Sequence, residues 1–299
     1  MVRAGAFVAM LVPAVLFAAT SRAEESTRIP DFSGFWARMT FGLEPPRSGE
    51  GGIVNLTKRP DGIADGTKLA GDYNSPLLKP WAAERVKALG EISKTGEAFP
   101  DPSNQCAPHG PPYLITQQQI QLLQGKDQVT IIYMLDAHVR RIYLNARHPE
   151  KVTPSWTGHS VGHYEGDTLV VDTVGIKTGP LTMSDRLGSP QSEAMHVTER
   201  YRIIDHETAV KAAAENEKLF ARIDGANGNG VWVDFEDKGR GLELEFTVED
   251  DGVFTKPWGA VQTYRKAGSP WQEQICAENT HEFYAGKDTA IPIAAKADF

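Results

Sequence analysis

The chain has 299 residues, with 31 basic and 39 acidic side chains, 40% hydrophobic residues and 2 cysteines. An acidic chain without a basic run lacks the electrostatic footprint of a nucleic-acid-binding protein. It also lacks the polybasic patch that holds a protein on anionic lipid. We therefore expect no nucleic-acid partner and no membrane insertion.

The N-terminal segment 1–23 predicts a secretory signal peptide. Arg3 precedes an apolar run from Ala4 to Ala19, and Ser21-Arg22-Ala23 has the small-x-small form of a cleavage site. Cleavage leaves a mature chain that starts near Glu24. Its formal net charge is −10 in place of −8, because 29 basic residues then face 39 acidic ones. The sequence therefore predicts a periplasmic or secreted protein.

Secretion places Cys106 and Cys276 in an oxidising compartment, where a disulfide between them is expected. Closing so long a loop stabilises a fold by about 5 kcal/mol in the chain-entropy model. The alternative is two separate buried thiols. Neither cysteine has the spacing of a zinc ribbon.

The mature chain, 24–299, predicts a single domain. Residues 41–112 are rich in Gly, Pro and charge, which predicts an irregular layer wrapped over the rest, with one helix from Pro80 to about Ile92. Residues 280–299 are predicted to form a loosely docked tail.

From Gln128 onward, hydrophobic and polar residues alternate with the period of half-buried strands. A tight hairpin is expected at 136–138, and Gly166-Asp167 suits a type II′ hairpin turn. Many short antiparallel strands favour a barrel or a sandwich. The predicted strands are 128–135, 139–145, 160–165, 168–173, 195–204, 241–250 and 260–266.

The segment "DFSGFWAR" contains Gly34-x-Trp36, and Arg265 lies on the last predicted strand. This resembles the lipocalin pattern, in which an arginine from the final strand closes over a Gly-x-Trp on the first by cation–π contact. The resemblance covers the barrel alone and implies a mainly β fold. Together with the composition of 41–112, it predicts an antiparallel lipocalin-like barrel with an irregular, partly helical N-terminal wrapping segment.

Several longer motifs also run along the chain. They are "CAPHGPP" (106–112), "RRIY" (140–143), "GHSVGHYEGDTLVVDTVG" (158–175), "HVTERYR" (196–202), "TKPW" (255–258) and "CAEN" (276–279). Together they resemble a poorly characterised family of secreted bacterial proteins. That resemblance implies lyase steps in the bacterial breakdown of plant-derived aromatic compounds.

The opening of the longest motif contains His159 and His163. On a helix this spacing would place both imidazoles on one face, as in the HExxH zinc proteases. On the predicted strand it separates their Cα atoms by roughly 13 Å, so one shared metal is not expected. A metal held by either histidine together with His196 across strands stays open as an alternative.

A turn at Gly166-Asp167 places His159, His163 and Asp172 on one face of the predicted hairpin. An apolar wall with a few polar groups is typical of a ligand cavity, so His163 and Asp172 are candidate substrate-binding residues. The alternative is that this face is solvated and that the face with Tyr164 points inward.

The strand at 195–204 carries His196 and Glu199 on opposite faces. A histidine near a carboxylate can act as an acid or a base near neutral pH, so His159, His196 and Glu199 are the candidate catalytic residues. The alternative for Glu199 is a cross-strand ion pair with an arginine such as Arg141.

Arg141 and Tyr143 share one face of their strand. The arginine suits a substrate carboxylate or phenolate, and the tyrosine suits an aromatic ring or a proton transfer. The alternative is that both are ordinary barrel surface. The histidines in turn-like or polar contexts are predicted to be surface residues: His109, His148, His206 and His281.

The chain contains no GxGxxG after a strand, no Walker loop and no HExxH. The segment 158–162, "GHSVG", has the letters of a GxSxG elbow, but Ser160 falls in a predicted strand and not on a strand-to-helix turn, so a serine nucleophile is not expected. We therefore expect an enzyme without a cofactor or metal, of the lyase or isomerase kind, which uses histidine and carboxylate acid–base chemistry on a small aromatic molecule. The competing hypothesis is a lipocalin-like carrier that binds such a molecule without turnover. A third is a divalent-metal hydrolase built from His159, His196 and a carboxylate.

Overall fold

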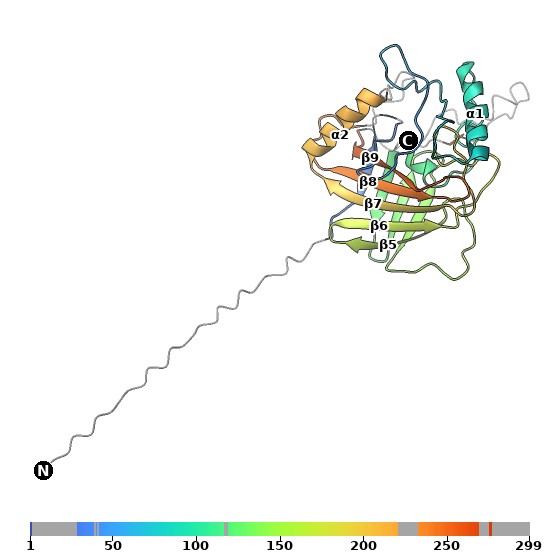
Figure 1. Ribbon diagram of the computed structural model, residues 1–299. Coiled ribbons are helices and arrows are strands. Elements are labelled where there is room, and N and C mark those ends of the chain that lie inside the picture. Colours follow the sequence, from blue (N-terminus) through green and yellow to red (C-terminus); the bar gives the residue numbers. More distant parts are fainter. Residues whose placement is uncertain are drawn as a thin grey trace, which may run out of the picture.

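A computed structural model gives the structure (Figure 1). It describes residues 1, 29–38, 40, 42–116, 119–220, 233–268 and 275–276. Apart from Met1, the predicted signal peptide (1–23) lies outside the described residues, as do His281 and the predicted tail (280–299). Among the helices of the described part, none is long and apolar enough to cross a membrane.

The predicted barrel is confirmed: in the described part of the chain, nine strands close into one sheet in sequence order. The strands are β1 (Gly34–Ala37), β2 (Gln119–Gln124), β3 (Gln128–Tyr133), β4 (Val139–Leu144), β5 (His159–Glu165), β6 (Thr168–Val174), β7 (His196–Ile204), β8 (Gly241–Glu249) and β9 (Trp258–Lys266). Neighbouring strands are antiparallel except β4 and β5, which are parallel. A parallel pair needs a connection of a dozen or more residues, and 145–158 provides it.

The hairpin of β5 and β6 has the predicted register. His163 pairs with Val170, and Val161 pairs with Asp172. Gly166 has φ +62°, the left-handed conformation that the first central position of a type II′ turn requires. Because side chains alternate across a strand, this register determines which residues share a face.

The inner face of the barrel is packed around a buried ion pair. The Arg140 guanidinium donates to both carboxylate oxygens of Glu199, and the two side chains are 1% and 0% exposed. Burial acts to lower the pKa of Arg140, but the charge of Glu199 raises it well above its usual value. The ion pair has further hydrogen bonds to four neighbours: Tyr133, Ser160, Thr173 and Tyr201.

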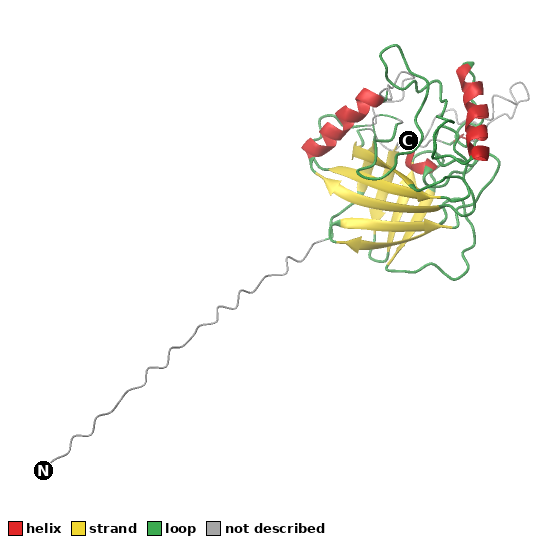
Figure 2. Ribbon diagram, viewed as in Figure 1, coloured by secondary structure: helices red, strands yellow, loops and turns green. Residues whose placement is uncertain are grey.

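The irregular segments of the first third and both helices gather on one side of the barrel, at the top of Figures 1 and 2, whereas β5 and β6 form the opposite edge. The predicted helix is confirmed as α1 (Pro80–Lys94), with proline at its first position. Val86 of α1 and Leu77 before it are buried in the main core. A backbone bridge between Leu78 and Phe254 joins this layer to the β8–β9 connection.

A second helix, α2 (His206–Leu219), was not predicted. Asp205 caps it by accepting a hydrogen bond from the Thr208 backbone N–H at 2.8 Å. A Cβ atom added at Gly241 of β8 would lie 2.5 Å from the Cβ of Ala209 in α2. The close approach of helix and strand therefore depends on glycine at this position.

The lipocalin-like closure of Trp36 by Arg265 takes a different form. Trp36 is 3% exposed, and its indole N–H donates to the Phe32 carbonyl at 3.0 Å. The Arg265 guanidinium instead lies 5.8 Å from the centroid of the Phe235 ring. β1 and β9 are nevertheless paired, with Ala37 opposite Arg265, so the barrel closes through the backbone.

Breaking the ion pair is expected to destabilise the fold. Arg140→Met leaves the Glu199 carboxylate buried without its partner, which costs about 3–5 kcal/mol of the free energy of unfolding. The double variant Arg140→Met/Glu199→Leu removes both charges and is expected to lose less than the single variant. Urea unfolding measures both. A single variant within 1 kcal/mol of wild type would contradict this role.

Glu44 gives the fold a pH dependence. Burial raises its pKa to about 7 from an ordinary 4.5, although two hydrogen bonds from Thr263 act against the shift. A carboxyl whose folded-state pKa is raised binds its proton more tightly in the folded state, so stability falls as pH rises through this window.

Glu44→Gln removes the charge and should stabilise the protein at pH 8, by on the order of 1–3 kcal/mol, with little effect near pH 5. Urea unfolding of wild type and variant at both pH values measures the difference. An equal difference at the two pH values would show that the charge of Glu44 is not the cause.

Candidate functional site

The candidate residues of β4 to β6 lie on the outside of the barrel. The side chain of His163 is 55% exposed and that of Asp172 is 43% exposed. Tyr143 is 42% exposed, and Arg141 is also exposed. The expectation that this face lines an internal cavity is therefore wrong. The pleat that turns Ser160 and Thr173 into the barrel turns His159, His163 and Asp172 out of it.

The outward residues nevertheless form a connected group, which we call the outer ledge: His148, His159, Asp172, His196 and Glu249. Asp172 contacts His196 Nε2 through one oxygen and lies 3.4 Å from His148 Nε2 through the other. His196 Nδ1 lies 3.2 Å from Glu249, and His148 Nδ1 lies 2.8 Å from His159 Nδ1. The Tyr143 ring stacks on His159 with centroids 5.5 Å apart.

Glu199 lies apart from the ledge. It is fully buried and its carboxylate is bonded to Arg140 and Tyr201. The three candidate catalytic residues His159, His196 and Glu199 therefore do not converge. The ion-pair alternative for Glu199 matches the structure, although the partner is Arg140 and not Arg141, because only Arg140 faces inward.

A second polar group lies where β3 turns into β4. The predicted disulfide between Cys106 and Cys276 is present, with Cα atoms 5.3 Å apart. The Cys276 backbone N–H donates to Asp136 Oδ1 at 2.6 Å. Three segments distant in sequence are thus held together at this end of the barrel.

The β3–β4 turn itself has an unusual backbone. Asp136 and Ala137 have φ values of +56° and +46°. Cys106, in the segment that the disulfide holds beside this turn, has φ +49°. Two successive left-handed residues form the type I′ hairpin turn, which normally contains Asn or Gly. Non-glycine residues in this conformation cost on the order of 1 kcal/mol or more and cluster at functional sites.

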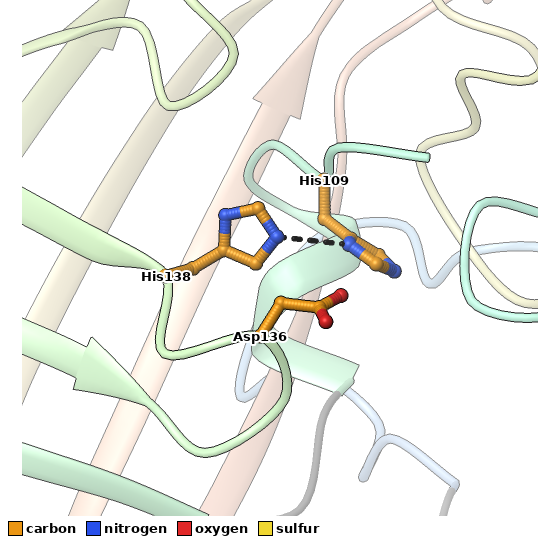
Figure 3. Close-up of side chains that lie close together, drawn as sticks. All are labelled: His109, Asp136 and His138. Atoms are coloured by element: carbon orange, nitrogen blue, oxygen red, sulfur yellow. Dashed lines mark hydrogen bonds between the residues drawn. The ribbon is translucent and has the colours of Figure 1, made fainter. Parts of the chain in front are cut away.

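This turn brings together three residues that we call the mouth cluster: His109, Asp136 and His138 (Figure 3). His109 Nδ1 and His138 Nε2 are 3.3 Å apart, with the two rings nearly perpendicular. His109 is 1% exposed, so the prediction that it is a surface residue is wrong. Burial lowers its pKa to about 3, with further lowering from His138 and Arg186, so the imidazole is neutral.

A chain of hydrogen bonds leads from the mouth cluster to Asp101. Asp101 acts to raise the pKa of Tyr113, both by its charge and as an acceptor, so we orient the Tyr113 hydroxyl toward this carboxylate. Ser103 Oγ lies 3.1 Å from Tyr113 Oη and 3.2 Å from His109 Nε2. With this orientation, Ser103 donates to Tyr113, and His109 Nε2–H donates to Ser103. This leaves His109 Nδ1 as an acceptor, facing His138.

A cavity of about 370 Å³ adjoins this chain. Its wall contains polar side chains, among them Asp101, Ser103 and Arg186, and apolar ones, among them Leu69 and Phe99. The volume falls in the range of roughly 300–1,000 Å³ typical of small-molecule sites.

Sequence reasoning missed this site because its residues lie in turns and in a Gly- and Pro-rich segment, where polar side chains are usually solvated. The 3₁₀ turn η1 (Tyr113–Thr116) is instead fully buried, and the Tyr264 hydroxyl donates to the Ile115 carbonyl at 3.3 Å. The signals were present: "CAPHGPP" contains both Cys106 and His109, and "DAH" contains Asp136 and His138.

Comparison of the chain with protein-family models, curated proteins and solved structures finds no match. Function is therefore argued from the geometry of the site.

The disulfide is expected to hold the mouth together. The double variant Cys106→Ser/Cys276→Ser should lose about 2–5 kcal/mol of the free energy of unfolding, because the unfolded chain is no longer constrained. Urea unfolding measures the loss. Amide hydrogen exchange in 106–112 and 135–138 should accelerate more than in β6 and β7. Unchanged exchange at the mouth would contradict this role.

Proposed function

We propose that the protein is a periplasmic or secreted enzyme of the lyase or isomerase kind, which acts on a small aromatic molecule by acid–base chemistry in the cavity beside the mouth cluster. One observation carries the proposal: the hydrogen-bond chain from His138 to Asp101 passes Ser103, and both Ser103 and Asp101 line the cavity. Directed hydrogen bonds that border a cavity are a feature of acid–base sites. The disulfide fits an oxidising compartment.

The cavity wall supplies the groups that such chemistry needs. Asp101 is a carboxylate and can accept a proton. The Arg186 guanidinium suits a substrate carboxylate or phenolate, and Phe99 offers a surface for an aromatic ring. Ser103 can accept a hydrogen bond from a substrate hydroxyl, because its own proton is directed to Tyr113 and one lone pair of its oxygen remains.

A retro-aldol cleavage fits these roles. Asp101 takes the proton of a substrate hydroxyl, a carbonyl forms at that carbon, and the adjacent carbon–carbon bond breaks. The electron pair of that bond passes to the leaving fragment, whose own carbonyl group takes it up as an enolate. A proton returned by Asp101 then neutralises this enolate. Arg186 stabilises the negative charge that grows on the fragment. The step needs no oxidant or reductant.

The test is turnover of a panel of aromatic β-hydroxy carbonyl compounds, measured by the release of an aldehyde. In wild type, Asp101 Oδ1 accepts a hydrogen bond from the Asn104 backbone N–H at 2.7 Å. Asp101→Asn keeps an oxygen for this bond but removes the base. We expect kcat to fall by about 100-fold or more while the ligand still binds. Arg186→Leu should instead raise KM.

The matched control is Asp167→Asn, an exposed acid in the β5–β6 turn, which should keep full activity. His159→Ala and His196→Ala on the outer ledge should also keep it. Loss of activity in the ledge variants would place the chemistry on the outer face. Binding without conversion by wild type would support the carrier hypothesis instead.

A further inference from the structure

We propose that the mouth cluster of His109, Asp136 and His138 binds a divalent transition-metal ion of the Zn²⁺ type. This goes beyond the proposed function, because the roles given to Asp101, Ser103 and Arg186 need no metal. The donor set of two imidazoles and one carboxylate suits Zn²⁺, Co²⁺ and related ions.

The spacing of the donor atoms matches a metal site. Metal–nitrogen bonds of about 2.0–2.1 Å in a tetrahedron place two nitrogen ligands about 3.3 Å apart. His109 Nδ1 and His138 Nε2 are 3.3 Å apart. One ligand atom from each member of the cluster, Asp136 included, lies within 4.8 Å of the others. Figure 3 shows the two rings turned toward each other above the Asp136 carboxylate.

The surroundings prepare two of the ligands. His109 Nε2–H is directed to Ser103, which leaves the Nδ1 lone pair pointing at the proposed ion. Metal-binding histidines commonly donate their other N–H to an oxygen, which fixes the tautomer. Asp136 Oδ1 accepts the Cys276 N–H at 2.6 Å, and Oδ2 can complete the site. His138 needs only to carry its proton on Nδ1 in place of Nε2.

The site is also reachable and held in place. His109 is buried, whereas Asp136 and His138 are partly exposed, so an ion can enter from solvent. The three ligands come from two segments. Cys106 of the first segment is bonded to Cys276, whose backbone N–H donates to Asp136 of the second. Three protein ligands leave a further coordination position, as in metal sites that bind water or a substrate atom.

The outer ledge is the competing location for a metal. There, His196 has both ring nitrogens directed at carboxylates, one of Asp172 and one of Glu249. Among the described residues, the mouth cluster is the one group of three or more such donors whose ligand atoms converge within 4.8 Å.

The experiment titrates the purified, oxidised, chelator-stripped protein with Co²⁺, followed by visible absorption, and with Zn²⁺, followed by calorimetry. We expect one equivalent of each ion to bind. His138→Ala and Asp136→Asn should weaken binding about 10-fold or more. His206→Ala, which removes a histidine at the start of α2, is the matched control and should bind as wild type does.

Zn²⁺ should also raise the unfolding midpoint of wild type but not of His138→Ala, because a ligand stabilises only a fold that binds it. Equal unfolding midpoints of the two metal-free proteins would show that the variant is folded. The proposal would be overturned if wild type showed no saturable binding. It would also be overturned if His138→Ala left binding unchanged and His196→Ala abolished it.

The two proposals fail separately. If turnover in the chelated protein depends on Asp101 and no Co²⁺ binds, the metal site alone is wrong. If Co²⁺ binds at the cluster and Asp101→Asn keeps full turnover, the assigned acid–base role alone is wrong.

Discussion

The buried ion pair between Arg140 and Glu199 constrains the rest of the barrel. Two charges can lie inside a protein only when they meet each other and their remaining hydrogen bonds are satisfied. Arg140 therefore has to point inward on β4, and Glu199 on β7, with Ser160 and Thr173 beside them. Once these residues face inward, the pleat turns their sequence neighbours outward. The same interaction that fills the barrel thus places the histidines of β5 and β7 on its surface.

Because side chains fill the inside of the barrel, the proposed site lies outside it. The layer formed by residues 42–116 lies against one side of the barrel, and η1 is buried against β9. The disulfide fastens this layer to the β3–β4 turn. Neither the layer nor the turn would hold the mouth cluster alone. The site exists because segments more than a hundred residues apart meet there.

The strands β3 to β9 and the β5–β6 register were predictable, because local signals determine them: alternation of hydrophobic residues and a glycine in the turn at Gly166. β2 was not among the predicted strands. The sequence does not determine which face of the β5–β6 hairpin points inward, since both faces mix polar and apolar residues. Arg140 and Arg141 show the difficulty. They are adjacent and chemically identical, yet one is the buried partner of Glu199 and the other is exposed, and only the position of neighbouring strands decides which.

The helix α2 and the mouth cluster escaped prediction for separate reasons. The cap at Asp205 is a local signal that could have been read as a helix start. The burial of His109, in contrast, depends on long-range packing between the layer, the disulfide and the β3–β4 turn. A histidine between a proline and a glycine gives no local indication of it.

The central claim is that the proposed site lies beside the mouth cluster, where a neutral His109 orients Ser103 in a hydrogen-bond chain that ends at Asp101. The most direct measurement is NMR of the imidazole nitrogens in the metal-free, ¹⁵N-labelled protein at neutral pH. The account predicts that His109 carries its proton on Nε2 and none on Nδ1. A proton on Nδ1, or on both nitrogens, would contradict it.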